Sequence, residues 1–510
     1  MAKRFIHYEV KNGIEYASVY TPRRENGKKV NDPEYLGRVI DKEKGIYRSR
    51  ARGVFAYSLE RGYAYEIEGT SVYELANVRE KEKLILDFGD AYCLYFALQE
   101  TGLHDIIHNL LPGHEDTLMS LVGYKLLASA SNRYVEEWWI GSYTSILFPK
   151  ARIQSQGISK FYRQFGEEKI QREFFKRYLN QFYPNHSVGV LIDSTGLPND
   201  MNFPLPLTAI NTHNGVTSNE TRLLLVVEQK SGMPLFFRYN AGNIVDVTTL
   251  RATFAEMKAY NIQITNAIVD AGYYSEANIR SLYGDVDEEP IPFITRMGTN
   301  LKLYKTLLAE NAEDLTKAKY LLMQRDRLVS VKRVEIDLFG HLGYAYVILD
   351  HARREDEIYK YARTTIGSND VSYEEMDMAM KLKGFCIIIS SEKIDTKDIL
   401  PLYYTRQAAE QVFDVSKNYA ELLPLRVHNE DTFRGHILLS FITTVAFLSC
   451  NQLLKGTPYN AEGAFMILRN QKCKVFNDYI LTKEPNKKMN EIYKKLKINP
   501  PLQIPYCGKN

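Results

Sequence analysis

Four polar side chains in the carboxyl-terminal half of the chain recur at intervals that suit one face of a helix. Their relative positions are 0, 3, 7 and 14, and they are Tyr403, Arg406, Glu410 and Lys417. At about 100° per residue they fall within a stripe of about 60°, with alanines and valines opposite. This predicts an amphipathic helix that presents a carboxylate flanked by two cations and a phenol. Taken alone, the stripe is also typical of a solvated face with an Arg406–Glu410 ion pair.

Two aspartates each follow a short apolar run. Asp193 follows residues 188–192, and Asp270 follows residues 267–269. Such runs are typical of strands buried on both faces. A single aspartate at a strand end is usually a turn former. Two that end strands of one sheet can bring their carboxylates together at its edge, and Glu410 can join them from a covering helix.

Three carboxylates that converge in a cleft supply the hard oxygen ligands that Mg²⁺ or Mn²⁺ prefers. Two such ions about 4 Å apart can hold the attacking and leaving oxygens of a phosphodiester displacement. Cations beside them suit a phosphate backbone. The sequence therefore predicts a two-ion site formed by Asp193, Asp270 and Glu410.

The elements that must position these residues follow a β-β-β-α-β-α-β order. Apolar runs predict strands at 188–192, 223–227, 235–239, 267–269, 291–295 and 385–389. Helices are predicted at 247–260, with Asp246 as cap, from Ser275 onward and from near Tyr403. This order predicts an α/β fold with an RNase H-like catalytic core, in which a mixed sheet is flanked by helices. Charged, Tyr-rich sequence interrupts the order and is interpreted as a β-rich insertion.

The chain is long enough for about three domains. An amino-terminal β/helical region and a carboxyl-terminal helical segment are expected to flank the interrupted core. The predicted segments are a small basic β-containing module with possible DNA binding at 1–75, a helical region at 76–186, the first part of the core at 187–296, the insertion subdomain at 297–383, the second part of the core at 384–455 and a basic segment at 456–510.

Nothing in the sequence indicates a membrane span. The longest apolar run, Ile437–Cys450, has 14 residues, whereas a span needs about 20, so we expect a buried core helix. The five cysteines form no C-x-x-C pair and have no His partners at zinc-ligand spacing, so we expect reduced thiols. The amino terminus has no apolar stretch behind its charged start, so we expect no signal peptide and a cytoplasmic location.

Positive charge is concentrated in three segments. The whole chain has 65 Lys and Arg against 62 Asp and Glu. Local excesses are larger: 13 against 7 in residues 1–53, 7 against 3 in residues 151–183 and 7 against 2 in residues 480–510. Several basic segments suit a polyanion that touches the chain in several places. Each segment alone is also typical of a solvated face.

Four motifs occur in one order along the chain. They are Ile192-Asp193-Ser194-Thr195-Gly196, then Gly232-x-Pro234-Leu235 with Gly242-Asn243-x-x-Asp246, then Val269-Asp270-Ala271-Gly272-Tyr273, and Tyr403-x2-Arg406-x3-Glu410-x6-Lys417. Over roughly residues 187–455 the chain resembles bacterial insertion-sequence transposases. The resemblance is to the cut-and-paste DDE group with a Y-R-E-K signature, the insertion sequence 4 superfamily.

The resemblance implies roles for individual residues. Asp193, Asp270 and Glu410 would be a triad that binds two Mg²⁺ or Mn²⁺ ions. Residues that would contact DNA near the transposon end are Tyr403, Arg406, Lys417 and Arg296. The partners implied are double-stranded DNA, both transposon ends and target, and a second copy of the chain in a synaptic homodimer. Family members nick DNA at terminal inverted repeats, often pass through a hairpin intermediate, and join 3′ ends to target DNA.

One feature departs from the resemblance. In related enzymes a Trp of the insertion stacks on a flipped base near the hairpin, whereas the two tryptophans here, Trp138 and Trp139, precede Asp193. A Tyr or Phe of the insertion can take that role, since any aromatic face can stack a base. We expect Trp138 and Trp139 to be packing residues of the helical region.

Two other functions are compatible with these motifs. One is a decayed or domesticated DNA-binding protein of the same fold, in which the catalytic residues are vestigial. The other is an RNase H-like nuclease that hydrolyses DNA without joining strands. The sequence favours an active transposase, because the triad and all four signature residues are intact.

Overall fold

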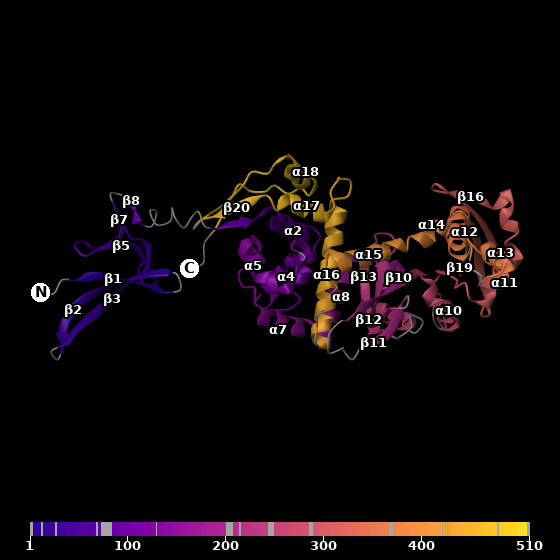
Figure 1. Cartoon of the computed structure of the whole chain (residues 1–510), viewed down its shortest axis with the longest axis horizontal. Helices are drawn as coiled ribbons and strands as arrows, with labels where there is room; N and C mark the ends of the chain where they lie inside the picture. The colour runs from indigo at the N-terminus through magenta and orange to yellow at the C-terminus, as the bar shows by residue number, and fades with distance from the viewer. Residues whose placement is uncertain are drawn as a thin grey trace. The chain divides into compact units, whose positions relative to one another are not determined.

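The structure is a computed structural model of the chain (Figure 1). It describes residues 4–11, 14–25, 28–67, 70–72, 84–128, 130–199, 208–213, 216–242, 249–284, 289–366, 371–420, 422–423, 425, 427, 429–476 and 479–506. The chain forms two compact units. The first contains Met1–Asp90, Ile140–Tyr143 and Ile467–Asn510, and the second contains Ala91–Trp139 and Thr144–Met466.

The first unit begins with an antiparallel sheet whose six strands are neighbours in chain order. The strands are β1 (Phe5–Lys11), β2 (Ile14–Glu25), β3 (Lys28–Asp41), β4 (Ile46–Ser49), β5 (Gly53–Ser58) and β6 (Gly62–Ala64). Successive residues of β4 and β5 pack into different clusters, Tyr47 with Phe55 and Ile46 with Val54. Successive strand residues point to opposite faces, so both faces of this sheet are partly covered. β7 (Glu66–Ile67) and β8 (Thr70–Ser71) form a separate pair.

The carboxyl-terminal segment contains strands as well as helices, which corrects the prediction of a helical segment. β20 (Lys472–Val475), β21 (Tyr479–Thr482) and β22 (Gln503–Pro505) form a sheet with β9 (Ile85–Asp87), and α18 (Lys487–Lys495) lies between β21 and β22 in the chain. Burial alternates along β20 and β21. Four-residue strands are too short for that alternation to stand out in the sequence.

The second unit is built on a ten-stranded sheet with the order β11-β12-β10-β14-β15-β19-β18-β17-β16, and β13 also pairs with β12. The strands are β10 (Ser187–Pro198), β11 (Ala209–His213), β12 (Val216–Glu228), β13 (Pro234–Ala241), β14 (Gln263–Val269), β15 (Phe293–Arg296), β16 (Leu321–Gln324), β17 (Arg327–Leu338), β18 (His341–Asp350) and β19 (Phe385–Ser390). β10, β14 and β15 run parallel, and the remaining pairs are antiparallel. The predicted mixed sheet is therefore present.

Strands β16–β18 belong to this same sheet. β18 pairs with β19, and β19 pairs with β15. The predicted strands at 223–227 and 235–239 lie in β12 and β13, which form an antiparallel hairpin with Gly232 at φ +70° in its turn, a conformation that glycine adopts without strain. Asn243 and Asp246, the latter the predicted cap of the following helix, lie outside the described residues.

The helices from α2 to α17 fall into two groups along the chain. The first group precedes β10 and comprises α2 (Gly89–Glu100), α3 (Leu103–His108), α4 (Glu115–Leu127), α5 (Val135–Gly141), α6 (Thr144–Leu147), α7 (Ser155–Phe165) and α8 (Glu168–Phe182). The second comprises α9 (Leu250–Ala259), α10 (Glu276–Tyr283), α11 (Lys302–Asn311), α12 (His351–Thr365), α13 (Tyr373–Lys381), α14 (Ile399–Tyr404), α15 (Gln407–Asn418), α16 (Glu430–Leu453) and α17 (Ala461–Leu468). Ser275 caps α10 by accepting from the Asn278 amide, as a helix start there predicts.

The apolar run Ile437–Cys450 lies in α16, which contacts α4, α7, α15 and β13 (Figure 1). Within the described residues, α16 is long and apolar enough to cross a membrane by length and composition, yet 89% of its most apolar window is buried inside the protein. The run therefore forms a core helix, as predicted. Four of the five cysteines lie among the described residues and all four are free thiols.

Candidate active site

Asp193 and Asp270 lie on neighbouring strands at the point where a parallel ladder ends. β10 and β14 pair in parallel, and their last partners are Ile192 and Val269. Asp193 follows Ile192 directly, and Asp270 follows Val269 directly. Neighbouring strands lie about 4.8 Å apart, so the register brings these two positions together although 77 residues separate them in the sequence.

Asp193 does not end its strand, which corrects the sequence-based expectation. β10 continues to Pro198 and stays paired there with β12. The partner of Asp193 on that side is the buried Leu225. Because β12 supplies backbone partners beyond the apolar run, the strand persists through polar residues and only its parallel neighbour stops.

The predicted single helix around Tyr403 is two helices, α14 and α15. The amides of Thr405 and Arg406 bond to carbonyls three residues earlier, those of Leu402 and Tyr403, at 3.2 and 3.1 Å. The Thr405 hydroxyl also donates to the Leu402 carbonyl at 2.6 Å. Such bonds form a tighter 3₁₀-type turn between the α-helical segments. The break separates Tyr403 from Glu410 and Lys417 and leaves Arg406 at the start of α15.

The guanidinium of Arg406 lies against all three predicted carboxylates. Its Nη1 is 3.0 Å from Asp193 Oδ2, and its Nη2 is 2.9 Å from Glu410 Oε1 and 3.9 Å from Asp270 Oδ1. Asp270 Oδ1 and Glu410 Oε1 are both close to Arg406 Nη2. The distance between these two oxygens is therefore at most the sum of the two distances, about 7 Å. α15 also contacts β10 and β12 directly, which explains why a helix residue reaches the strand carboxylates.

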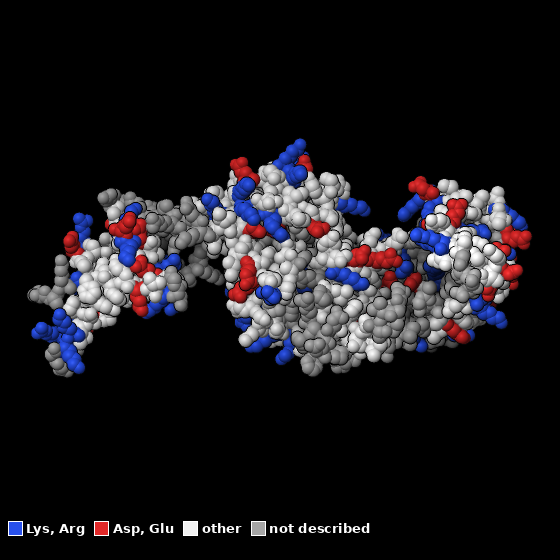
Figure 2. Space-filling model, in the orientation of Figure 1, with Lys and Arg blue, Asp and Glu red and all other residues white. Residues whose placement is uncertain are grey.

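Tyr403 and Lys417 reach the same group of strands from either side of Arg406. The Tyr403 hydroxyl donates to Asp270 Oδ1 at 3.4 Å. Lys417 Nζ donates to Thr195 Oγ1 at 2.8 Å, two residues beyond Asp193. All four residues of the predicted stripe are therefore close to the strand positions that carry Asp193 and Asp270. Figure 2 shows basic and acidic side chains next to one another over the part of the chain labelled α14 and α15 in Figure 1.

The carboxylates differ in burial. The exposed fraction of the side chain is 16% for Asp193, 41% for Asp270 and 54% for Glu410, and it is 19% for Arg406. Burial raises the pKa of Asp193 to about 6, against the opposing effects of Arg406 and the Ser194 amide. Asp193 is therefore the most buried of the three carboxylates, and the charge of Arg406 opposes the effect of that burial on its pKa.

Burial also shifts the pKa values of the neighbouring groups. It raises the pKa of Tyr403, and the charge of Asp270 adds to that effect. It lowers the pKa of Lys417, against Asp414 and Asp193. For Arg406 burial acts to lower the pKa, but the charges of Asp270, Asp193 and Glu410 act to raise it, and the pKa is raised. Arg406 is thus a fixed cation and Tyr403 a neutral hydrogen-bond donor near neutral pH.

The donor set suits a hard divalent cation, because three carboxylates face one small region. Within the described part of the chain, no group of three His, Cys, Asp or Glu side chains stands close enough together to hold an ion. The Arg406 guanidinium lies against all three carboxylates, so a cation held by Asp193, Asp270 and Glu410 would have to share these ligands with Arg406.

Arg296 joins the site through a pocket of about 170 Å³. This pocket is also lined by Arg353, Tyr403, Arg406 and Glu410. Arg296 and Arg353 also line a cavity of about 890 Å³. The other cations on its lining are Lys305, Lys360, Lys381 and Lys383. Glu357 is the one carboxylate on that cavity's described lining, and it accepts from Arg353 Nε at 2.7 Å.

Two of these neighbours were not singled out from the sequence. Thr195 belongs to the motif after Asp193, and a hydroxyl two residues beyond a strand carboxylate lies on the same face of the strand, so period-two alternation is a signal that identifies it. Arg353 lies on α12, within the segment interpreted as an insertion. No spacing relates it to the aspartates, so only the folded chain reveals it.

One comparison with known proteins identifies a family. The model of a protein family described as transposase DDE domain matches residues 184–446, slightly more than half of the 510 residues. No curated protein matches the chain. Among similar solved structures is the cryo-EM structure of the piggyBac transposase synaptic complex with hairpin DNA. The likeness covers 74% of this chain and 75% of that chain, with 10% sequence identity and a TM-score of 0.40.

Proposed function

Because this chain belongs to the transposases with a DDE domain, we propose that it is an active transposase whose catalytic triad is Asp193, Asp270 and Glu410. It binds the terminal inverted repeats of an insertion sequence, cleaves DNA there and joins the 3′ ends to target DNA. The observation that carries the proposal is the contact of one guanidinium with all three carboxylates. The motif order along the chain favours the Y-R-E-K group, the insertion sequence 4 superfamily.

We infer that strands β10 and β12–β15 form an RNase H-like core. The support is their order, β13-β12-β10-β14-β15, in which three antiparallel strands are followed by two parallel ones. Residues 297–383 are then an insertion between β15 and β19, and its strands β16–β18 extend the core sheet. In this reading α15 brings Glu410 to the two strands after the insertion.

The triad would hold two Mg²⁺ or Mn²⁺ ions, since its donors are hard carboxylate oxygens. Ions bound there would activate the attacking oxygen and stabilise the leaving one. The protein's own residues position the DNA. Arg406 supplies positive charge beside the scissile phosphate and Lys417 supplies it beside the phosphates that follow near the transposon end. The Tyr403 hydroxyl, which keeps its proton, donates to a phosphate oxygen.

The reaction proposed is in-line displacement at phosphorus without a covalent protein intermediate. In the first step, water oxygen bonds to phosphorus and the bond to the DNA 3′ oxygen breaks, which leaves a 3′ hydroxyl and a 5′ phosphate. In the second step, that 3′ hydroxyl attacks a phosphate of the target strand and displaces another 3′ oxygen. The chemistry is the same in both steps, so one set of carboxylates serves both.

The partner proposed is double-stranded DNA, both at the transposon ends and at the target. The cations of the 890 Å³ cavity support it, because the described lining carries six Lys and Arg and one carboxylate. A polyanion at the triad can extend past Arg296 and Arg353 into that cavity. We also propose a homodimer that pairs two ends, cytoplasmic and bound to the nucleoid when it engages DNA.

The function is tested by incubating the full-length protein and Mg²⁺ with DNA that carries the repeats flanking the coding sequence. We expect nicking at the repeat and joining of the 3′ end. Asp193→Ala and Glu410→Ala should each reduce both by more than about 100-fold, since each removes a ligand of the ions. Asp414→Ala is the matched control, because this exposed carboxylate lies one turn from Glu410 on α15, and it should keep full activity.

The other outcomes separate the competing functions. Cleavage that survives either triad substitution contradicts the assignment of the triad. DNA binding without cleavage by the unaltered protein indicates a decayed or domesticated relative. Cleavage without joining, when a free 3′ end is supplied, indicates a nuclease that only hydrolyses.

A further inference from the structure

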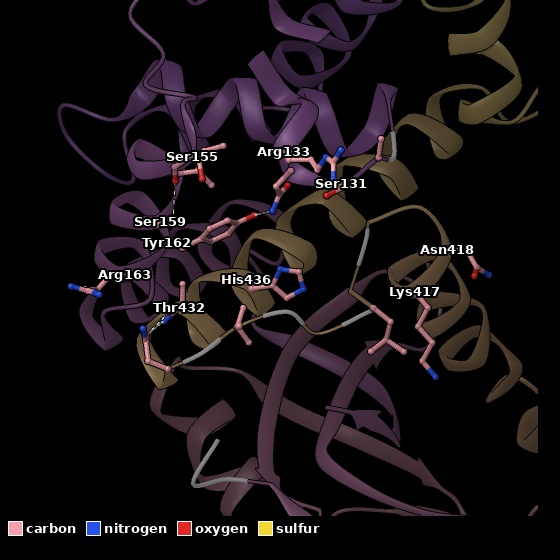
Figure 3. A pocket seen from close by; sticks show the side chains of 16 residues that line it. Ser131, Arg133, Ser155, Ser159, Tyr162, Arg163, Lys417, Asn418, Thr432 and His436 are labelled. Atoms are coloured by element: carbon pink, nitrogen blue, oxygen red, sulfur yellow. Dashed lines mark hydrogen bonds between the residues drawn. The ribbon is translucent and has the colours of Figure 1, made fainter. Parts of the chain in front are cut away.

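A further cavity, of about 720 Å³, shares Lys417 with the site described above and is also lined by residues that precede β10. Its walls come from η1 (Asn132–Tyr134), α7, the end of α15 and the start of α16. Figure 3 shows Arg133 on one side, Arg163 on α7 on another, Lys417 across from them, and His436 between on α16. None of these lining residues besides Lys417 belongs to the site already described.

The cavity is positively charged. Three cations line it, Arg133, Arg163 and Lys417, and none of its described lining residues is an Asp or Glu. The Arg133 guanidinium stacks on the Tyr134 ring at 4.6 Å. Neither arginine forms an ion pair with a carboxylate within the described residues. Cations held apart from carboxylates keep their full charge for an incoming anion.

The inner wall of the cavity adds no negative charge. His436 is buried, its Nε2 lies 3.1 Å from the Leu422 carbonyl, and burial with the nearby charge of Lys125 lowers its pKa to about 3. The first turns of α7 and α16 open onto the cavity at Ser155 and Thr432, and their backbone amides carry partial positive charge. The described lining therefore has no acidic side chain, and the partial negative charge of the last carbonyls of α15, at Asn418, lies next to the ammonium of Lys417 in the sequence.

Lys417 connects the cavity to the triad. Its side chain lines the cavity, and its Nζ donates to Thr195, two residues from Asp193. Lys417 is seven residues beyond Glu410 on α15, which is about 10 Å along a helix at 1.5 Å per residue. One strand of duplex DNA advances about 3.4 Å per nucleotide. A strand that runs along α15 from a scissile phosphate at Glu410 thus reaches Lys417, which lines the cavity, after about three nucleotides.

We propose that this cavity binds the backbone phosphates of the DNA strand about three nucleotides from the scissile phosphate, through Arg133 and Arg163. The inference rests on the proposed function for the position of the scissile phosphate. It also gives a role to the basic excess of residues 151–183, because Arg163 lies in that segment. The cavity volume of about 720 Å³ is larger than one free phosphate needs, which favours a continuous DNA backbone as the ligand.

The first test measures the affinity of the full-length protein for a labelled duplex of arbitrary sequence over a range of KCl concentrations. The logarithm of the association constant falls with the logarithm of salt by about 0.9 per phosphate contact. Arg133→Ala with Arg163→Ala should therefore reduce that slope by about two. The double Arg→Lys variant should keep the slope, and Lys160→Ala, an exposed cation on α7 that does not line the cavity, should change it by less than one.

An unchanged slope in the folded double Ala variant overturns the inference, as does an equal loss in Lys160→Ala. If the Ala variant does not fold, Arg133→Gln with Arg163→Gln replaces it. Cleavage at the triad is measured in parallel, so an unchanged slope with normal cleavage refutes the cavity alone. Absence of DNA binding by the unaltered protein refutes the proposed function with it.

The second test locates the contact. Single methylphosphonates, which remove one phosphate charge, are placed along the cleaved strand. A methylphosphonate about three nucleotides from the cleaved bond should weaken DNA binding by the unaltered protein. The same methylphosphonate should not weaken DNA binding by the double Ala variant any further. An equal effect on both proteins at that position contradicts the proposed path.

Discussion

Asp193 is the most buried carboxylate of the proposed triad, and its nearest positive partner is Arg406. A buried carboxylate without a cation costs several kcal/mol, so its pKa rises or it recruits a positive group. Arg406 supplies that group and also contacts Asp270 and Glu410. One cation thus links residues 193, 270 and 410, and the neighbouring Lys417 and Tyr403 complete the polar environment.

A buried histidine gives a residue-scale prediction on stability. The pKa of His436 in the folded chain is lowered to about 3 by burial and by Lys125, whereas it is about 6.5 in an unfolded chain. The unfolded chain therefore binds the proton more tightly, and stability falls as the pH drops from about 6.5 towards 3. At about pH 5 the loss from this group is about 2 kcal/mol. His436→Gln should abolish that part of the pH dependence.

The measurement is the free energy of unfolding at about pH 7 and about pH 5. Only the change between the two conditions is compared, because His436→Gln also alters packing. His7→Gln, at an exposed position in β1, is the control and should follow the unaltered protein. An identical loss in all three proteins would show that His436 is not kept neutral by burial.

At the scale of elements, two glycines set the crossing of α7 and α16. A Cβ atom at Gly435 would collide with the Tyr162 carbonyl, and one at Gly166 would collide with the Asp431 carbonyl. Both obstacles are backbone atoms, which cannot move aside without displacing a helix. This close approach positions the two helices that line the cavity next to Lys417.

Gly435→Ala should therefore destabilise the protein by about 1–3 kcal/mol, the usual cost of forcing extra volume into packed structure. Chemical denaturation measures the change. Gly141→Ala is the control, since no described atom lies within 4 Å of the position of its Cβ, and alanine favours a helix. Equal stability of the two variants would mean that α7 and α16 do not cross as closely as the structure has them.

The sequence predicts the elements of the site better than their ends. Apolar runs identify the strands that carry Asp193 and Asp270, because strands buried on both faces have no polar alternation. They do not predict that β10 continues to Pro198, since β12, which extends it, pairs through backbone groups. The break at Thr405 is equally hidden, because tightening a turn changes hydrogen-bond partners and not the pattern of apolar residues.

The sequence is least able to predict which residues from distant parts of the chain lie beside the site. Arg296 was identified through a resemblance, and it lines one pocket with Arg406 and Glu410. Arg353 lines the same pocket, yet nothing in its local sequence distinguishes it from other helix-surface arginines. Which cations gather around a site depends on pairings such as β15 with β19, and these join residues almost 100 positions apart.

At the scale of the whole molecule, one ten-stranded sheet organises the catalytic part of the chain. Its parallel pairs place Asp193 beside Asp270, and α15 returns after about 140 residues to bring Glu410. Positively charged cavities lie on two sides, one reached through Arg296 and one through Lys417. We propose that the three carboxylates beside this sheet act together on divalent cations.

Binding of divalent cations by these carboxylates can be tested through a change of metal preference. Asp270 is the position to alter, because its side chain is partly exposed and a thiol fits there with little effect on packing. Mg²⁺ prefers hard oxygen ligands, whereas a transition-metal ion such as Mn²⁺ accepts a softer thiolate better. DNA cleavage by Asp270→Cys, by Asp270→Ala and by the unaltered protein is measured in each metal.

For Asp270→Cys, the ratio of cleavage in Mn²⁺ to cleavage in Mg²⁺ should exceed that of the unaltered protein by at least about 10-fold, because the ligand itself has become softer. Asp270→Ala should stay inactive in both metals. A ratio for Asp270→Cys equal to that of the unaltered protein, or equal activity of the Cys and Ala variants in Mn²⁺, would contradict a direct contact between Asp270 and the catalytic ions.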